Sequence, residues 1–324
     1  MGNRTIGQTH DLYSVLPYIQ IARLDHWFKN VFMLPGIVLA IFDSPKLLSW
    51  NLIPSLFLGV LSTCLVASSN YVINEIIDAP KDKSHPIKKN RPIPSGRINV
   101  GIAYGEWIIF GLAGLFLSGL VNPYFFWSAA ALVAMGIIYN VPPIRSKDLP
   151  YIDVLSESIN NPLRLYLGWY ATGNTDYHPT LSLVMAYWMV GAFFMAVKRF
   201  AEYRRIADRK IASDYRNSFR FYSENSLLLS IIYYGTAFGL FGGIFLIRYR
   251  IELILAVPFI AGLIAAYLRL GFLEDSPAQY PEKLYRQAWF VIYISLCFLI
   301  ITFLLFVDVP FINYFFTPRH LPGR

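Results

Sequence analysis

Three oxygen-bearing side chains recur every four residues at the point where a long apolar run ends. Asn74, Asp78 and Asp82 follow the apolar residues 52–73, and on a helix this spacing places all three on one face, over roughly 12 Å. Amide and carboxylate oxygens are hard ligands that suit Mg²⁺, and Mg²⁺ in turn binds phosphate oxygens. The pattern predicts that Asn74, Asp78 and Asp82 bind Mg²⁺ and, through it, a diphosphate, with the two aspartates as catalytic residues.

Two neighbouring features bear on this prediction. Pro80 separates the two aspartates, and because the residue before a proline disfavours the helical conformation, Asp82 is expected on a loop or a new helical turn. Taken alone, the D-x₃-D pair beyond a helix end also fits an ordinary solvated loop. The basic residues that follow, including Lys88 and Arg91, favour a site for phosphate.

The composition is that of an integral membrane protein. Of the 324 residues, 56% are hydrophobic and only 15% are charged, and the apolar runs of about 20 residues are long enough to span a bilayer. Residues 1–25 lack the short apolar core and the cleavage site of a signal peptide. Cys64 and Cys297 lie inside apolar runs and are expected to be buried thiols rather than a disulfide or metal ligands.

The apolar runs predict an all-α fold of about nine transmembrane helices in a single domain, residues 1–324, with a cytoplasmic or interfacial N-terminal segment at residues 1–30. The net charge is +8, and the cations concentrate in the loops after every second helix. This distribution predicts that the N-terminus and the motif loops are cytoplasmic, and it argues against a nucleic-acid-binding surface. The nine predicted helices cover roughly residues 31–47, 52–76, 101–121, 123–141, 151–172, 180–202, 225–247, 251–270 and 286–307.

A second group of polar residues follows the fourth predicted helix. Tyr139 precedes a double proline that must end the helix, and Arg145 and Lys147 follow it. Both cations are expected at the cytoplasmic rim, where they can contact phosphates. Two cations at a membrane boundary are also common without any ligand.

Arg164 lies deep within an otherwise apolar predicted helix. An unpaired arginine at that depth is costly, so a partner is expected. Glu157 and Asp153 precede Arg164 by about two and three helical turns on a similar face, and the spacing predicts that they are its partners.

The segment at residues 74–96 contains N-x₃-D-x₃-D followed by R-P-I-P-S-G, and it resembles the first aspartate motif of the UbiA superfamily of intramembrane prenyltransferases. The resemblance implies an all-helical protein with a central lipid-facing cavity for an isoprenoid substrate, a cytoplasmic polar cap, and Mg²⁺ that holds a diphosphate. Most of the superfamily has a second acidic motif, Y-A-x-x-D. Here Phe200 and Ala201 align with its Tyr-Ala, and Arg204 replaces the aspartate.

Three elements are similar to one branch of this superfamily, the decaprenyl-phosphate phosphoribosyltransferases. They are W-x-K-N at residues 27–30, H-P and R-P-I at residues 85–86 and 91–93, and K-R-F-A-E at residues 198–202. The resemblance implies direct contacts from Lys198 and Arg199 to phosphate, although Y-x-x-P-P-x-R-x-K at residues 139–147 departs from the shorter form in that branch. The substrate-binding residues that follow from the motifs are Lys29, Asn30, Lys88, Arg91, Tyr139, Arg145, Lys147, Arg164, Lys198 and Arg199, with Glu202 as a further catalytic residue.

Together these features predict Mg²⁺-dependent transfer of a 5-phosphoribosyl group from phosphoribosyl pyrophosphate to a polyprenyl phosphate, in a bacterial or archaeal plasma membrane. The acceptor phosphate is already anionic, so no strong general base is needed, and its headgroup is expected at Lys29, Arg145 or Lys147. Two alternatives stay open. One is transfer of a polyprenyl group from its diphosphate to an aromatic or other lipid-soluble acceptor. The other is a membrane transporter, since intramembrane charge also marks ion pathways.

Overall fold

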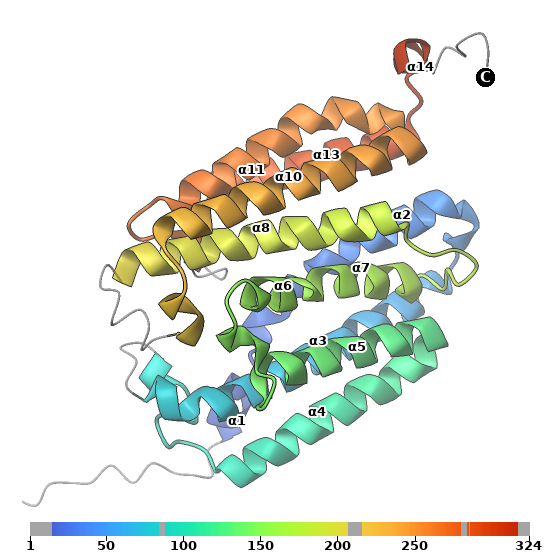
Figure 1. Ribbon diagram of the computed structural model, residues 1–324. Helices are drawn as coiled ribbons and strands as arrows, with labels where there is room; N and C mark the ends of the chain where they lie inside the picture. Colours follow the sequence, from blue (N-terminus) through green and yellow to red (C-terminus); the bar gives the residue numbers. More distant parts are fainter. Residues whose placement is uncertain (1–14, 84–87, 207–215, 280–283, 285, 317–324) are drawn as a thin grey trace, which may run out of the picture.

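The computed structural model is an all-helical bundle (Figure 1), and it describes residues 15–83, 88–206, 216–279, 284 and 286–316. Within these residues there is no β-strand, so the predicted all-α class is confirmed. Seven helical segments are long and apolar enough to cross a membrane. They are α3 (Leu52–Asp82), α4 (Val100–Val121), α5 (Pro123–Asn140), α8 (Leu181–Ile206), α10 (Glu224–Tyr249), η6 with α11 (Ile251–Gly271) and α13 (Ala288–Phe306).

The predicted count of nine spanning helices is not confirmed, because two of the predicted spans are interrupted. In place of the span 31–47, the described chain has a 3₁₀ segment η1 (Leu24–Met33) and the short helix α2 (Leu34–Asp43). In place of the span 151–172 it has α6 (Ile152–Ser158) and α7 (Asn160–Ala171). Pro162 at the start of α7 lacks the amide hydrogen that a continuous helix needs. Both interruptions place helix ends inside the bundle.

Seven shorter elements complete the described chain. They are α1 (Val15–Ile21), η2 (Pro45–Leu47), η3 (Lys88–Asn90), η4 (Ser146–Asp148), η5 (Asn217–Arg220), η7 (Pro277–Gln279) and α14 (Pro310–Phe316). Several helices begin at side-chain caps. Asn99 accepts a hydrogen bond from the Gly101 amide at the start of α4, and Ser223 and Ser226 form a capping box at the start of α10. These caps satisfy amides that the first helical turn leaves without partners.

Helix α3 is continuous through Pro80 and ends at Asp82, so the expectation of a loop or a new turn at Asp82 is wrong. Pro80 lies in the last turn, where little of the helix remains to be disrupted, and the Lys83 amide still donates to the Ala79 carbonyl at 3.2 Å. Asn74, Asp78 and Asp82 therefore share one uninterrupted helix, as the spacing required.

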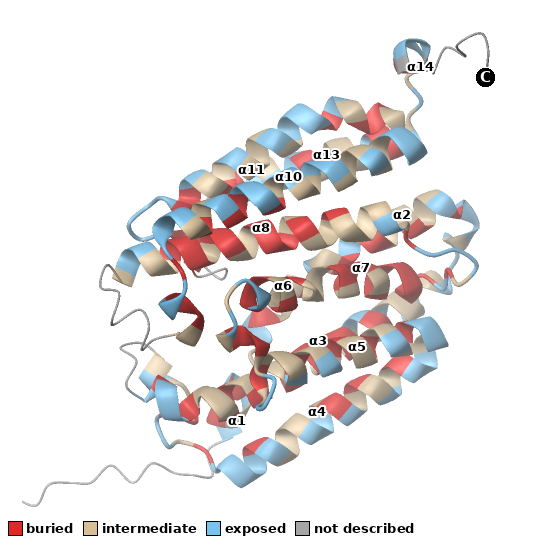
Figure 2. Ribbon diagram, viewed as in Figure 1, coloured by how far each residue is buried: buried red, intermediate tan, exposed pale blue. Residues whose placement is uncertain are grey.

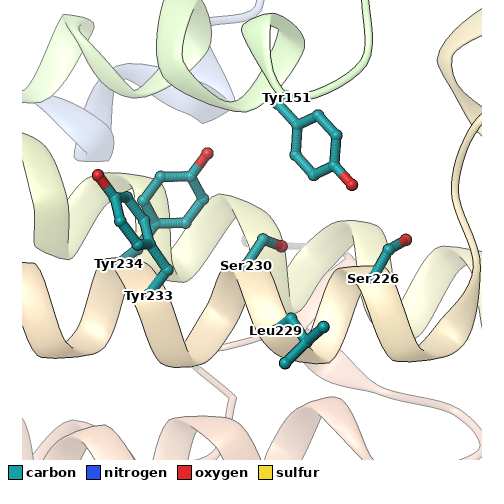
Figure 3. A pocket seen from close by; sticks show the side chains of 6 residues that line it. All are labelled: Tyr151, Ser226, Leu229, Ser230, Tyr233 and Tyr234. Atoms are coloured by element: carbon teal, nitrogen blue, oxygen red, sulfur yellow. The ribbon is translucent and has the colours of Figure 1, made fainter.

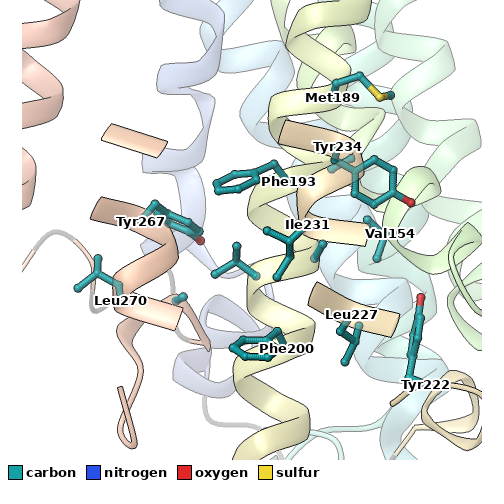
Figure 4. Packing of buried hydrophobic residues seen from close by; sticks show 14 of the residues in the cluster. Val154, Met189, Phe193, Phe200, Tyr222, Leu227, Ile231, Tyr234, Tyr267 and Leu270 are labelled. Carbon is teal, nitrogen blue, oxygen red and sulfur yellow. The ribbon is translucent and has the colours of Figure 1, made fainter. Parts of the chain in front are cut away.

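Helix α8 runs through the middle of the bundle (Figure 1). Helices α10 and α11 pack on one side of it and α6 and α7 on the other, with α3, α4 and α5 beyond. The apolar core between α8, α10 and α11 includes Phe193, Phe200, Leu227, Ile231 and Tyr267 (Figure 4). Buried positions concentrate at the centre of the bundle, and large apolar side chains are exposed on its outside (Figure 2). That outer surface is the one expected of a protein embedded in lipid.

Close backbone contacts hold α7 against η1 and α2. A Cβ atom at Gly168 would overlap the Met33 carbonyl, and one at Gly36 would overlap the Leu165 carbonyl. Small residues permit this approach, as they do between membrane helices in general. The interrupted helix α7 is thereby held between η1, α2, α3 and α5, and its polar side chains lie at membrane depth.

Candidate active site

Asp78 lies at the centre of a cationic contact between α3 and the loop after α5. Arg145 Nη2 lies 2.9 Å from Asp78 Oδ1, and Lys147 Nζ lies 2.7 Å from the same oxygen. Arg145 has a left-handed backbone conformation (φ 35°), and its Nε also donates to Asp148 at 2.9 Å. Burial lowers the pKa of Lys147 to about 8, and the Asp78 carboxylate opposes this shift. The structure thus brings together three of the predicted site residues.

Asn140, the last residue of α5, links the two sides of this contact and was not predicted. Asn74 Nδ2 donates to Asn140 Oδ1, and Lys147 Nζ donates to the same oxygen at 2.9 Å. The sequence contained a signal for it, because an amide two residues before a double proline lies at a forced helix end. Asn140 therefore links the Asn74 side chain to Lys147, which in turn contacts Asp78.

Asp82 forms a second cationic contact, one turn further along α3. Arg91 Nη1 lies 2.8 Å from Asp82 Oδ2, and Lys88 Nζ lies 3.8 Å from Oδ1. Burial lowers the pKa of the Lys88 ammonium group. The loop is anchored by the Ile93 amide, which donates to the buried Glu75 carboxylate at 3.1 Å. Residues 85 and 86, which contribute the H-P element to the predicted motif, lie outside the described residues.

Arg199 and Asp153 are completely buried, with no exposed surface. The Arg199 guanidinium group contacts three carboxylates, at 3.1 Å from Asp153, 2.9 Å from Glu157 and 3.0 Å from Glu202. Tyr139 donates to Glu157 at 2.6 Å and so joins the same network. Because every side of the guanidinium is engaged, we interpret Arg199 as the residue that orients these acids rather than as a direct phosphate ligand.

The predicted partners of Arg164 are wrong. Glu157 and Asp153 bind Arg199 instead, because the break at Ile159 separates α6 from α7 and the three side chains do not share one helix face. Arg164 Nε donates to Asn30 Oδ1 at 3.1 Å, and Nη1 donates to the Asn160 carbonyl at 3.3 Å.

Two further cations lie near the network, Lys29 from η1 and Lys198 from α8. They are close enough to interact electrostatically with each other, and Lys198 also interacts with Glu157 and Glu202. Burial, Lys29 and Arg23 lower the pKa of His26 to about 2, so that ring stays neutral. Both lysines are half-buried, and Lys198 lies beside the acids that Arg199 contacts.

Arg216, in the segment before α10, was not among the predicted site residues. Its Nη1 lies 3.7 Å from Asp153 Oδ2, and the residue interacts electrostatically with Lys88, Lys147 and Glu202. It therefore lies between the two cationic contacts on α3 and the network around Arg199. A basic residue in a long charged loop gives no sequence signal that distinguishes it from solvated neighbours.

A pocket of about 350 Å³ lies to one side of the network, between the start of α6 and α10 (Figure 3). Its lining residues are Tyr151, Ser226, Leu229, Ser230, Tyr233 and Tyr234. The Tyr151 amide donates to the Tyr222 hydroxyl, which in turn donates to Asp153 at 2.7 Å. The pocket thus adjoins the network but contains none of the predicted site residues.

The donor set on α3 suits a divalent cation. Asp78 and Asp82 each present a carboxylate to the same end of the bundle, and Asn74 adds an amide, which are the oxygen ligands that Mg²⁺ prefers. Among the described residues, no three His, Cys, Asp or Glu side chains gather as a metal-binding group, so this donor set consists of two carboxylates and the Asn74 amide. At the position of the second acidic motif, Arg204 replaces the expected aspartate.

Residues 31–293 match the model of the UbiA prenyltransferase family. The chain is 28% identical to a decaprenyl-phosphate phosphoribosyltransferase from Mycolicibacterium smegmatis, over 71% of this chain and 72% of the relative. It is 31% identical to a digeranylgeranylglyceryl phosphate synthase from Sulfurisphaera tokodaii, over 42% of this chain and only 46% of that relative.

A solved structure has the same fold. It is a UbiA homolog from Archaeoglobus fulgidus bound to GPP and Mg²⁺, which superimposes with a TM-score of 0.67 at 20% identity, over 88% of this chain and 99% of that chain. A second structure of the homolog, bound to DMAPP and Mg²⁺, gives a TM-score of 0.68.

Proposed function

We propose that this chain, which belongs to the UbiA prenyltransferase family, transfers a 5-phosphoribosyl group from phosphoribosyl pyrophosphate to a polyprenyl phosphate and releases diphosphate. It is an integral membrane transferase. The observation that carries the proposal is that Lys198 lies within electrostatic range of Lys29, Glu157 and Glu202, in addition to the cations that contact Asp78 and Asp82. A donor with a diphosphate at one end and a monophosphate at the other needs two such groups of cations.

The diphosphate end of the donor is assigned to α3. Asn74, Asp78 and Asp82 would hold Mg²⁺, and the metal, when bound, neutralises the charge that develops on the leaving diphosphate. Lys147 and Arg145 already lie within 2.9 Å of Asp78. When a metal takes over that carboxylate, both cations are close enough to donate to diphosphate oxygens instead. The UbiA homolog structures with Mg²⁺ and prenyl diphosphates support this assignment.

The ribose 5-phosphate is assigned to Lys29 and Lys198. Their mutual repulsion is relieved when an anion binds between them. Arg199 fixes the orientations of Glu157 and Glu202. Their carboxylates can accept hydrogen bonds from the ribose hydroxyl groups. Glu202 then contributes to catalysis by positioning the sugar rather than by moving a proton.

The reaction is a displacement at the anomeric carbon of the donor. An oxygen of the acceptor phosphate contributes an electron pair to a new bond with that carbon. The bond from the carbon to the diphosphate breaks, and its electron pair leaves with the diphosphate. The acceptor is an anion before it attacks, so no side chain has to remove a proton.

Prenyl transfer is the second candidate, because the relatives at 31% and 35% identity are both digeranylgeranylglyceryl phosphate synthases. One pair of incubations separates the two. Purified protein with Mg²⁺ is given labelled phosphoribosyl pyrophosphate and a polyprenyl phosphate, or separately a polyprenyl diphosphate with an aromatic acid or with a glyceryl lipid. Labelled lipid in the first incubation alone supports the proposal. Product in the second alone would refute it.

A further inference from the structure

Arg164 carries a charge at membrane depth for which the described chain provides no carboxylate within salt-bridge distance. The residue is only 8% exposed. Its hydrogen bonds go to neutral groups, the Asn30 side chain and the Asn160 carbonyl. Arg199, by comparison, is matched by three acids. Burying an unpaired guanidinium is costly, and such a residue in a membrane protein marks a site for an anion or a charge pathway.

The surroundings of Arg164 form a prepared polar site between η1, α3 and α7. The Asn30 side chain accepts a hydrogen bond from Arg164 and donates one to the Cys64 thiol at 3.2 Å. These two bonds fix the orientation of the Asn30 amide group. The hydroxyl groups of Tyr71 and Tyr187 lie close enough to interact electrostatically with the guanidinium, and both tyrosines are only partly buried. An arginine whose orientation is fixed in this way loses little freedom when it binds a phosphate.

The depth of this site matches the geometry of the reaction. Tyr71 precedes Asp78 by seven residues on α3, which is about 10 Å further into the bundle. In a displacement, the incoming oxygen lies on the face of the reacting carbon opposite the leaving group. With the diphosphate at Asp78, the attacking phosphate lies on the membrane side of the ribose, and the lipid tail extends deeper still.

We infer that Arg164, supported by Asn30 and Tyr71, binds the phosphate of the isoprenoid acceptor. This inference rests on the proposed phosphoribosyl transfer. It replaces the expectation that the acceptor headgroup meets Lys29, Arg145 or Lys147 at the rim, since the proposed function assigns Lys29 to the 5-phosphate of the donor and the two cations beside Asp78 to its diphosphate. The acceptor is thereby defined as a lipid phosphate monoester whose headgroup enters from the bilayer while the soluble donor enters from the opposite end.

Equilibrium binding of farnesyl phosphate and of farnesol to purified protein tests the inference without turnover. The wild type should bind farnesyl phosphate at least about tenfold more tightly than farnesol. Arg164→Gln should weaken farnesyl phosphate binding by about 10- to 100-fold and leave farnesol binding unchanged. In the same variant, the dissociation constant for phosphoribosyl pyrophosphate with Mg²⁺ should stay within about twofold of the wild-type value. Arg248→Gln, at an exposed position on α10, is the matched control. It should leave the dissociation constants of all three ligands unchanged.

Three results would overturn the inference: unchanged farnesyl phosphate binding by Arg164→Gln, an equal loss for both ligands, or no preference for the phosphate in the wild type. Arg164→Lys keeps the positive charge, and it is the test variant to use if Arg164→Gln does not fold. It should weaken only farnesyl phosphate binding, by several-fold, and an equal loss of affinity for both ligands would count against the inference. Failure of the wild type to bind phosphoribosyl pyrophosphate would instead refute the proposed function, and the two failures are therefore distinguishable.

Discussion

Lys147 Nζ lies 2.7 Å from Asp78 Oδ1, although the two residues are separated by 69 positions in the sequence. The contact joins the loop after α5 to the end of α3 and neutralises a carboxylate that would otherwise be expensive at this position. It also places a phosphate-binding cation directly beside the expected metal ligand. The site is therefore organised before substrate binds.

Asp78→Asn should reduce turnover by more than about 100-fold, because an amide cannot replace the carboxylate charge that binds the metal. The thermal unfolding temperature is measured in parallel, because the amide keeps the shape of the side chain but leaves Lys147 without its carboxylate partner. Asp176→Asn is the matched control, at an exposed position whose contact with Lys46 is 3.5 Å long. The rate is measured against Mg²⁺ concentration for both variants. Near-normal turnover of Asp78→Asn with Mg²⁺ still required would refute the metal assignment.

Lys198→Ala and Arg199→Ala should behave differently although the residues are adjacent. Lys198→Ala should raise the KM for phosphoribosyl pyrophosphate by about 10- to 100-fold, with little change in stability, if it contacts the 5-phosphate. Arg199→Ala leaves Asp153, Glu157 and Glu202 without their shared cation, and should lower the free energy of unfolding by about 3–5 kcal/mol.

Substrate titration and thermal unfolding in detergent measure the two effects. A stable Arg199→Ala variant whose only defect is a raised donor KM would show that Arg199 contacts the substrate directly. A normal donor KM in Lys198→Ala would remove Lys198 from the 5-phosphate site.

Gly168→Ala should destabilise the protein, because the added methyl group would overlap the Met33 carbonyl where α7 meets η1. Overpacking of this kind costs about 1–3 kcal/mol. Gly239→Ala is the control on α10, where an added Cβ meets nothing within 4 Å, and it should be neutral or slightly stabilising. Equal unfolding temperatures for the two variants would contradict the close packing of α7.

The class of the fold and the first acidic motif could be predicted from sequence because both depend on local pattern. Apolar runs long enough to span a bilayer identify the spanning helices, and the spacing of Asn74, Asp78 and Asp82 is a property of one helix. The interruption of the predicted spans at 31–47 and 151–172 could not be read from apolar content. Hydropathy averages over a window and does not register the break at Ile159, after which Asn160, Asn161 and Pro162 begin a new helix.

The errors at the site have the same origin. Pairing Arg164 with Glu157 assumed one continuous helix, and the break at Ile159 invalidates that assumption. The true partner of Glu157 is Arg199, 42 residues further along the chain. Contacts between elements distant in sequence depend on tertiary packing, and a single sequence carries no local pattern for them. Arg216 was missed for this reason, whereas Asn140 had a local signal in its place two residues before the double proline.

Topology is testable with single cysteines at opposite ends of the bundle. Ser95 is exposed beside the end of α3, and Tyr177 is 60% exposed in the segment before α8. The distribution of cations predicts that Ser95 faces the cytoplasm. A membrane-impermeant thiol reagent applied to intact cells should therefore label Tyr177→Cys and not Ser95→Cys. The native Cys64 and Cys297 are buried and provide a low background. Labelling of Ser95→Cys from outside would reverse the assigned orientation.

The identity of the donor is tested most directly by following two labels in phosphoribosyl pyrophosphate, one in the ribose and one in the diphosphate. Purified protein is incubated with this donor, Mg²⁺ and a polyprenyl phosphate, and the lipid and aqueous phases are separated and counted. The account predicts that the ribose label enters the lipid phase and that an equal amount of labelled diphosphate is released into water, both abolished by Asp78→Asn. Retention of both labels in intact water-soluble donor, while a polyprenyl diphosphate is consumed by the same preparation, would contradict it.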